Sequence, residues 1–448
     1  MKLFNTLSRK IEEFKPLNPS DVKMYICGPT VYDYAHLGHC RTYVNSDILV
    51  RTLRWLKYQV KTVMNITDVG HLTSQADTGE DKVEKKARQE KKTAREIAAY
   101  YTADFWQMAN ALNIVKPDIV CPATQHISEM IKLIKVLEQK GYTYKTSDGI
   151  YFNTAKFSGY GQLARLDING LRQGWRVAKR EKKNPTDFAL WKFSPKDEQR
   201  QMEWASPWGI GFPGWHIECS TMSMKYLGPN LDIHTGGVDH IPIHHTNEIC
   251  QSEAVTGKPF VKYWFHSNFL DIDNEKMSKS LGNFIRLQDL VDKGYDPLAL
   301  RYLFLTGHYR TKMNFTYKAL DGAAEAYKKL KVLIKTSVNS KSKLLDFPAK
   351  FKSAVENDLS MPQALAVVWE MARSGLAAGE KKKLAEEWDQ VLGLNLGQIS
   401  NSQLPIPNKI KNLIKQREEL RRQKKFAEAD KLRQQIEARG ISVQDAKL

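Results

Sequence analysis

Short apolar runs alternate with helix-compatible segments in the first part of the chain. Residues 22–27 form an apolar run that ends at Gly28 and Pro29, and residues 60–66 form a second run rich in β-branched side chains. Runs of this kind, bounded by turn residues, are typical of strands. The segment 39–58 between them is compatible with a helix. This order of strand, helix and strand predicts a βαβ unit and therefore a parallel sheet.

For more than a hundred residues after this unit, the hydrophobic pattern predicts no further strand of the parallel sheet. Residues 77–112 are charged and helix-forming, and residues 120–141 form a second helical pattern that ends at a glycine. Residues 142–214 mix aromatic side chains with glycine and proline, which predicts an insertion built from short strands.

Strand signals return in the second half. They lie at residues 231–234 and 260–272, and a helix is expected to begin between them near Pro242. Beyond Tyr317 the composition is almost entirely helical. The predicted fold class is α/β: a Rossmann-like parallel-sheet domain with an inserted subdomain, followed by a C-terminal α-helical domain.

Charge and cysteine usage narrow the class of protein. The net charge of +18 favours a polyanionic partner. No apolar stretch approaches the roughly 18 residues that span a bilayer, and no secretory signal is visible, so we expect a soluble, cytoplasmic protein without membrane contact. The five cysteines are scattered and odd in number, which favours free thiols or metal ligands over disulfides.

The C-terminal segment 409–439 is dense in charged residues and has an apolar stripe. Two interpretations stay open: a solvated helical hairpin or short coiled coil, and a helical surface that contacts a nucleic-acid backbone. The basic residues that the second interpretation involves are Arg417, Arg421, Arg422, Lys424 and Lys425.

Two short motifs indicate binding of a phosphorylated ligand. His36 and His39 stand three residues apart with Gly38 between them, so both imidazoles lie on one face of a helix, where a phosphate or purine fits. The second motif, residues 276–280, reads Lys-Met-Ser-Lys-Ser and follows the last strand candidate. Its lysines and hydroxyl groups suit a polyphosphate.

Together the two motifs resemble the signatures of the class I aminoacyl-tRNA synthetases. That resemblance implies that the two motifs bind ATP with Mg²⁺ from both sides while the carboxylate of an amino acid attacks the α-phosphate. The implied catalytic residues, which would neutralise the phosphates, are His36, His39, Lys276 and Lys279. Gly38 and Ser278 are the further ATP-binding residues that it implies.

Four dispersed residues form a plausible zinc set: Cys27, Cys219, His244 and Glu248. From the residues alone, ordinary buried thiols and a satisfied histidine remain an open alternative. The segments that contain them resemble the cysteinyl-tRNA synthetases, however. This resemblance implies one Zn²⁺ per subunit on these four residues, with the thiolate of L-cysteine as an added ligand. It also implies tRNA(Cys) as the acceptor, and we expect a monomer.

Three further residues follow from the same family resemblance. Thr67, Trp215 and Asp239 are expected around the substrate, with Asp239 facing its ammonium group. Packing or helix-capping roles remain open for all three. The chain also departs from the family: acidic residues do not directly follow Asp68, Phe212 replaces a common arginine, and a tryptophan-containing tail is missing.

The resemblance also places domain boundaries. We expect the two halves of the catalytic domain at residues 1–112 and 215–316, with an insertion at residues 113–214 between them. A helical bundle at residues 317–400 and a basic anticodon-side region at residues 401–448 should follow.

Two other functions compete with cysteinyl transfer to tRNA. A related ligase would activate cysteine but transfer it to a small amine. Such an acceptor gives no reason for the extended basic surface of the helical C-terminal region. A non-enzymatic RNA-binding descendant would lack ATP-dependent activation. A methionine-type enzyme is set aside because the chain has no Cys-x-x-Cys pair.

Overall fold

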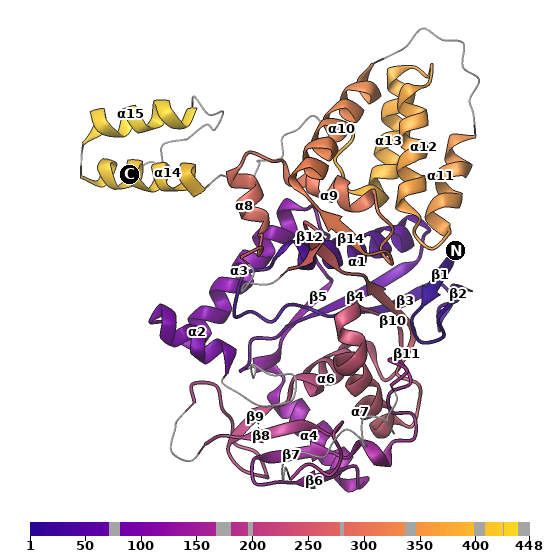
Figure 1. Ribbon diagram of the computed structural model, residues 1–448, viewed down its shortest axis with the longest axis vertical. Coiled ribbons are helices and arrows are strands. Elements are labelled where there is room, and N and C mark those ends of the chain that lie inside the picture. The colour runs from indigo at the N-terminus through magenta and orange to yellow at the C-terminus, as the bar shows by residue number, and fades with distance from the viewer. Residues whose placement is uncertain are drawn as a thin grey trace.

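A computed structural model describes residues 1–70, 81–166, 181–195, 200–277, 282–336, 346–397, 408–423 and 425–437. Its centre is a five-stranded, fully parallel sheet in the order β11-β10-β3-β4-β5 (Figure 1). The strands are β3 (Asp21–Ile26), β4 (Gln59–Ile66), β5 (Ile119–Pro122), β10 (Leu231–Gly237) and β11 (Val261–Ser267). The predicted α/β class with a Rossmann-like parallel sheet is confirmed.

Side chains of the central strand point alternately to two cores. Met24 and Ile26 of β3 pack with helix α1 (Leu37–Trp55) on one face of the sheet. Tyr25 and Cys27 point to the opposite face, where α6 (Trp215–Leu227) lies. Because side chains alternate along a strand, Cys27 faces α6 and not α1.

Most predicted elements are present, but two local predictions were wrong. The helical pattern assigned to 120–141 begins with a strand, β5, which pairs in parallel with β4; the helix α4 covers only Ile127–Gln139. The run 260–272 is also not one strand. It divides into β11 and β12 (Leu270–Ile272), and β12 belongs to a separate small sheet with β13 (Glu275–Lys276) and β14 (Met313–Phe315).

The short strands predicted between residues 142 and 214 form a four-stranded antiparallel sheet, next to α4, α6 and α7 (Thr246–Thr256) in Figure 1. Two helices, α2 (Lys82–Glu90) and α3 (Ala94–Ala111), follow β4. The strands of the antiparallel sheet are β6 (Thr143–Lys145), β7 (Gly149–Phe152), β8 (Phe188–Phe193) and β9 (Gly211–Pro213).

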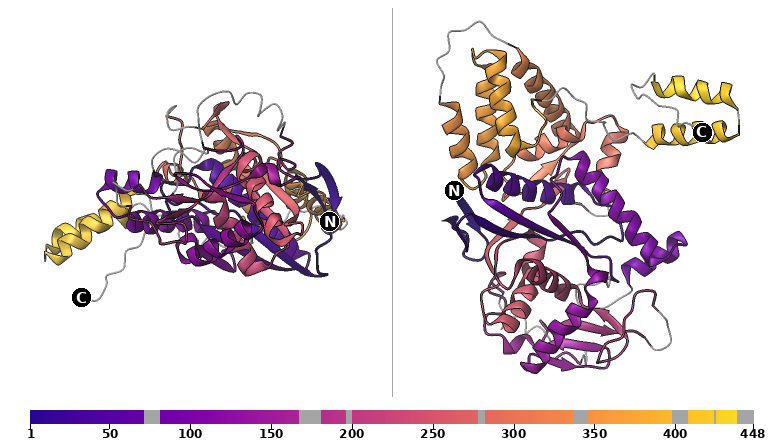
Figure 2. Two further views of the ribbon diagram at one scale, coloured as in Figure 1. Left: turned by 90° about the horizontal axis from the view of Figure 1, so that it is seen from below. Right: turned by 180° about the vertical axis from the view of Figure 1, so that it is seen from behind.

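From Tyr317 onward the described part of the chain is helical, as expected. Two helices, α8 (Leu287–Asp292) and α9 (Pro297–Leu305), precede β14. The next four pack as a bundle against the α1 side of the sheet (Figure 1): α10 (Tyr317–Lys335), α11 (Phe347–Glu356), α12 (Met361–Arg373) and α13 (Ala378–Leu392). The last two, α14 (Asn408–Arg422) and α15 (Phe426–Glu437), form a hairpin that projects from the rest of the molecule (Figures 1 and 2).

Candidate active site

The first signature motif caps the N-terminus of α1. Nδ1 of His36 accepts hydrogen bonds from the backbone N–H groups of Gly38 (3.1 Å) and His39 (3.4 Å). The His36 N–H donates in return to Nδ1 of His39 (3.2 Å), and the two rings stack with centroids 3.8 Å apart. This reciprocal arrangement satisfies N–H groups that the first helical turn leaves unpaired.

Gly38 is explained by the same cap. A Cβ at this position would lie 2.9 Å from Cε1 of His36, so the ring could not reach the helix N-terminus past a larger residue. Burial lowers the pKa of His36 to about 4, which keeps Nδ1 free to accept at neutral pH. Neutral histidines at a helix N-terminus leave its positive dipole end available to an anion.

The segment after the second signature motif lies against the first one. The carbonyl of Ile285 accepts a hydrogen bond from the N–H of Leu37 (3.0 Å), and the Phe284 ring meets His36 edge-on at 5.4 Å. Lys276 is on β13 and is exposed to solvent. Ser278 and Lys279 lie outside the described residues. Thus the segment that follows the second motif lies beside the first motif, although the two motifs are about 240 positions apart in the sequence.

A cavity of about 270 Å³ opens at the carboxyl ends of the central strands. This is the edge at which open parallel α/β sheets bind ligands. Its wall includes the strand ends, the first signature motif and the N-terminus of α6, with the side chains of Cys27, Tyr34, His39, Tyr101, Trp215 and Asp239 among them.

The four predicted metal ligands gather at this end of the sheet. Ligand atoms of Cys219, His244 and Glu248 lie within 4.8 Å of one another, and the same limit joins Cys27 to His244 and His245. The thiols of Cys27 and Cys219 are in hydrogen-bonding contact. All four predicted residues are buried, at 6% exposure or less.

Unpaired atoms in this cluster test whether it fits a metal ion. Nε2 of His244 and Oε1 of Glu248 are buried and 3.0 Å apart, but their geometry leaves the hydrogen-bonding capacity of both atoms unsatisfied. Orphaned buried polar atoms are costly, and a cation between them would remove that cost. Two thiols, an imidazole and a carboxylate are also a donor set that zinc accepts. The residues therefore fit a zinc ion.

The electrostatics of the cluster point the same way. Burial opposes a charge on His244, but Glu248 and Cys219 outweigh burial and raise its pKa to about 10. Burial would also raise the pKa of Glu248, yet His234 and His244 lower it to about 2. The buried negative charge that keeps a proton on the His244 imidazole would also favour a divalent cation in place of that proton.

Local backbone geometry positions this cluster. Residues Ile241–His245 form one π-helical turn before α7, so the helix predicted to begin near Pro242 starts with a widened turn. A π turn is a frequent feature of functional sites. At the end of β3, a Cβ on Gly28 would lie only 1.7 Å from the carbonyl oxygen of Asn65. Only glycine allows the ends of β3 and β4 to approach so closely, directly after Cys27.

Sequence reasoning missed a set of histidines around the cluster. His216 bonds to His244 through their Nδ1 atoms (3.0 Å), and Nε2 of His234 contacts Glu248 (3.0 Å). His245 in turn bonds to His266 (2.8 Å). These contacts fix the orientation of the candidate ligands, as outer partners of metal ligands do. A signal existed: six of the eleven histidines lie between positions 216 and 266.

The three predicted substrate residues have different environments. Trp215 and Asp239 both line the cavity. The Trp215 ring lies 4.3 Å from that of the buried His244, whereas the Asp239 side chain is 60% exposed. Thr67 is buried and its hydroxyl donates to Glu218 (2.9 Å), whose pKa burial raises to about 8. Thr67 thus supports the wall from behind.

The departure at Phe212 has a structural counterpart. The guanidinium of Arg200 lies 3.9 Å from the centre of the Phe212 ring and pairs with Asp81, the N-cap of α2. It also contacts Glu84 at 3.9 Å. A cation therefore occupies the space above Phe212, but it comes from another segment of the chain.

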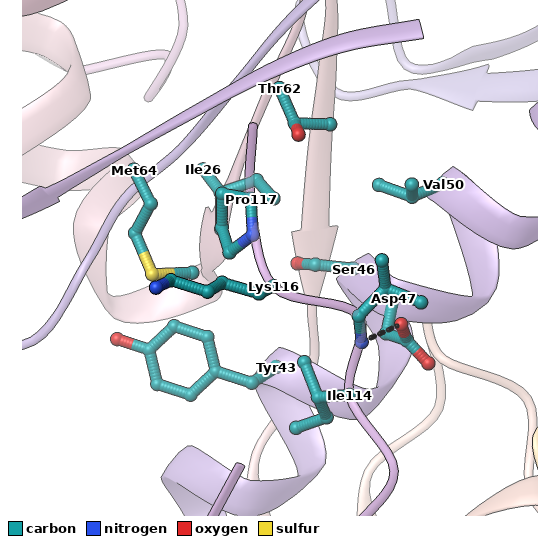
Figure 3. A pocket seen from close by; sticks show the side chains of 11 residues that line it. Ile26, Tyr43, Ser46, Asp47, Val50, Thr62, Met64, Ile114, Lys116 and Pro117 are labelled. Atoms are coloured by element: carbon teal, nitrogen blue, oxygen red, sulfur yellow. Dashed lines mark hydrogen bonds between the residues drawn. The ribbon is translucent and has the colours of Figure 1, made fainter. Parts of the chain in front are cut away.

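A second cavity lies on the α1 face of the sheet (Figure 3). It holds only about 10 Å³, the space of a single water molecule. Its acidic group, Asp47, already accepts from Val115 N (2.8 Å), Arg51 (2.8 Å) and Arg301 (2.6 Å). We interpret this cavity as a packing gap and not as a substrate site.

Comparison with known proteins agrees with this geometry. The family model described as the class I (C) tRNA synthetase catalytic domain matches residues 13–325. Fold and signature motifs thus define a class I aminoacyl-tRNA synthetase. A second model, the cysteinyl-tRNA ligase anticodon binding domain, matches residues 405–448. The chain belongs to the cysteine–tRNA ligase family.

Individual relatives extend over nearly the whole chain. Cysteine–tRNA ligase 1 of Burkholderia lata is 49% identical over 446 residues, which cover 99% of this chain and 95% of the relative. The cysteine–tRNA ligase of Treponema denticola is 42% identical over 480 residues, covering 99% and 98%. Methionyl-tRNA synthetase of Mycobacterium tuberculosis, in complex with methionyl-adenylate, superposes with a TM-score of 0.59 at 14% identity and covers 86% of this chain and 95% of its own. At that identity it shows the shared fold alone.

Two further expectations can be compared with the structure. Among the described residues, no helix combines the length and apolar character needed to cross a membrane. All five cysteines are buried and free, in agreement with the expectation of thiols or metal ligands.

Proposed function

We propose that this protein is a cysteine–tRNA ligase. It activates L-cysteine with ATP, forms cysteinyl-adenylate and diphosphate, and transfers the cysteinyl group to tRNA(Cys). The observation that supports this most is the buried cluster of Cys27, Cys219, His244 and Glu248 beside a cavity at the strand ends. Cys27 belongs to both, so a thiol substrate in the cavity reaches the cluster.

Activation depends on alignment and charge. The helix N-terminus capped by His36 and His39 attracts the phosphates of ATP, and Lys276 and Lys279 with Mg²⁺ complete their neutralisation. Gly38 and Ser278 are the further ATP contacts in this proposal. The cysteine carboxylate then attacks the α-phosphate, and diphosphate leaves. Asp239 pairs with the ammonium group of cysteine, and Trp215 covers its side chain.

Selection of cysteine over serine rests on the buried cluster. Cys27, Cys219, His244 and Glu248 would hold one Zn²⁺ per subunit. Bound there, zinc supplies a Lewis acid that prefers a thiolate to a hydroxyl group and lowers the pKa of the thiol. The protein contributes burial, which excludes water from the cluster, and the histidine contacts that orient the ligands. A site that requires one polar contact rejects an analogue lacking it by large factors.

The first experiment is amino-acid-dependent exchange of diphosphate into ATP across the twenty amino acids, with zinc measured on the same samples. Cys219→Ser should lose both zinc and cysteine-dependent exchange. Cys121→Ser is the matched control, because Cys121 is equally buried on the same face of the sheet, its thiol donates to the Met64 carbonyl (3.4 Å), and it belongs to none of the candidate metal groups among the described residues. Exchange with another amino acid, or zinc retained by Cys219→Ser, would contradict the proposal.

The acceptor is tested separately. Transfer of cysteine to tRNA(Cys) and not to a small amine distinguishes this function from an amino-sugar ligase, and any transfer excludes a non-enzymatic RNA-binding protein. A monomer in the cytoplasm is part of the proposal; the five free thiols support a reducing compartment. Light scattering and cell fractionation test these two points.

A further inference from the structure

Four tyrosines lie at one side of the active-site cavity and continue outward to the surface. Tyr32, Tyr34 and Tyr101 belong to the cavity wall. Tyr100, next along α3, is 46% exposed. The hydroxyl groups of Tyr34 and Tyr100 are 2.9 Å apart. Aromatic surface thus extends without interruption from the cavity to solvent.

The rings of this cluster meet edge to face. Tyr34 lies 5.0 Å from Tyr101 and 6.2 Å from Tyr100, and Tyr100 lies 5.1 Å from Tyr101. Tyr101 is 2% exposed and packs in a core with Val83 and Ile97. Its presence is explained by packing. Tyr100 contacts the same rings but leaves nearly half of its large side chain in water beside the cavity.

Basic side chains surround the same rings. Lys92 lies 5.0 Å above Tyr100, Lys82 lies 5.2 Å above Tyr32, and the Arg286 guanidinium lies 4.5 Å above Tyr34. Residues 82–96 contain seven lysines and arginines but only three glutamates. Partly exposed aromatic rings among cations suit single-stranded nucleic acid, because every base has a π face and every nucleotide a phosphate.

The position of this surface matches what the second half of the reaction requires. A tRNA must bring its terminal ribose to the adenylate, so its unpaired 3′ end has to enter the cavity. Arg286 is two residues from Phe284, which contacts His36 of the first signature motif. The tyrosines, two of which belong to α3, therefore lie between the adenylate site and α2, which is at the outer side of the molecule (Figure 1).

We propose that Tyr34 and Tyr100 form a stacking platform for the nucleobases at the 3′ end of tRNA, with Lys82 and Lys92 beside the phosphate backbone. This inference rests on the proposed function and assigns positioning residues for its transfer step. The two rings lie 6.2 Å apart, so the exposed ring stands directly beside one that lines the cavity.

Three variants of full-length protein test the platform. Tyr100→Leu keeps apolar volume but removes the π face, whereas Tyr100→Phe keeps the ring and removes only the hydroxyl. Tyr317→Leu is the control, because Tyr317 is also exposed (36%) and also lies under a lysine, Lys293, at 5.3 Å. Each is measured in diphosphate exchange, in single-turnover transfer, and with tRNA that contains 2-aminopurine in its 3′-terminal nucleotides.

We expect Tyr100→Leu to raise the KM for tRNA about 5- to 150-fold, the range that corresponds to loss of about 1–3 kcal/mol for one stacked base. Fluorescence quenching of 2-aminopurine on binding should be lost in the same variant. Diphosphate exchange should keep its KM for ATP and for cysteine, and Tyr100→Phe and Tyr317→Leu should resemble the wild type in every assay.

Several results would overturn the platform. The first is unchanged transfer and quenching in Tyr100→Leu. The second is an equal defect in Tyr100→Phe, which would indicate a structural role of the hydroxyl. The third is a raised KM of Tyr100→Leu for ATP in diphosphate exchange, which would assign the ring to nucleotide binding. Wild-type protein without cysteine-dependent exchange would instead overturn the proposed function, and the platform with it.

Discussion

Arg41 connects the first signature helix to the segments around the small β12 sheet. The side chain is 1% exposed, and its guanidinium donates to the carbonyl groups of Asn268 (2.7 Å), Phe269 (2.7 Å), His308 (3.1 Å) and Thr311 (2.6 Å). Burial lowers its pKa to about 10, so the group remains charged at neutral pH. We predict that Arg41→Lys loosens both carbonyl segments without unfolding the protein.

The magnitude follows from the geometry of the donors. Four carbonyl groups from two loops surround one planar guanidinium, whereas lysine offers three donors from a single nitrogen. At least one or two bonds are lost, and each hydrogen bond to a charged group contributes about 1.5–3 kcal/mol. One or two lost bonds correspond to about 1.5–6 kcal/mol. We expect a local loss in the middle of that range, about 2–4 kcal/mol, which is smaller than the net stability of about 5–15 kcal/mol of a typical domain.

Hydrogen exchange followed by mass spectrometry measures this loss locally. Peptides covering 268–272 and 308–315 should exchange roughly 25- to 700-fold faster in Arg41→Lys, the factor that 2–4 kcal/mol corresponds to. Strand β7, in the antiparallel sheet, should exchange as in the wild type. The control is Arg54→Lys on the same helix, whose ion pair with Asp118 (3.0 Å) is 34% and 46% exposed and should contribute under about 1 kcal/mol. Wild-type exchange rates in both peptides of Arg41→Lys would refute the reasoning.

Four further predictions test other parts of the structure. Trp215→Ala should raise the KM for cysteine in diphosphate exchange by about tenfold or more while bound zinc stays constant, because the ring lines the cavity and only covers the cluster. His36 has a pKa lowered from 6.5 to about 4, so its stabilising cap is complete above pH 6.5 and is lost as the pH falls toward 4; ring titration by NMR, assigned with His36→Asn, should show the low midpoint. Arg301→Leu leaves the buried Asp47 carboxylate without its closest cation (2.6 Å) and should lower the free energy of unfolding in urea by about 3–5 kcal/mol. Removal of residues 398–448 should preserve cysteine-dependent exchange but abolish efficient charging of tRNA(Cys), since the anticodon-binding model matches 405–448.

The histidine cap and β5 illustrate how far local sequence reasoning extends. The His-x-Gly-His motif marks a helix start because its ring and backbone contacts span only three residues. Residues 119–122, in contrast, form a strand only because β4 lies beside them, and nothing local separates this apolar run from the helix that follows. Pairing with a segment more than fifty residues away overrode the local pattern.

The candidate metal cluster shows the same division at the site. Ligand types could be proposed from Cys27, Cys219, His244 and Glu248 together with a family resemblance. Their convergence depends on side chains alternating across β3, on α6 packing against that face, and on the π turn before α7. The gathering of six histidines between positions 216 and 266 was a signal in the sequence. Which of them meet, and where the tyrosine surface lies, could not be predicted from spacing, because these contacts join separate elements.

The sequence by itself determined the element types in most of the chain, the two signature motifs and the chemical nature of the candidate ligands, since these depend on local pattern and residue type. Only the tertiary structure decided which face of the sheet each ligand reaches, which carbonyl groups Arg41 joins, and where the aromatic surface meets the cavity. Those outcomes depend on contacts between residues up to 270 positions apart, as in the bond from Arg41 to Thr311, and such contacts form only when the whole core packs.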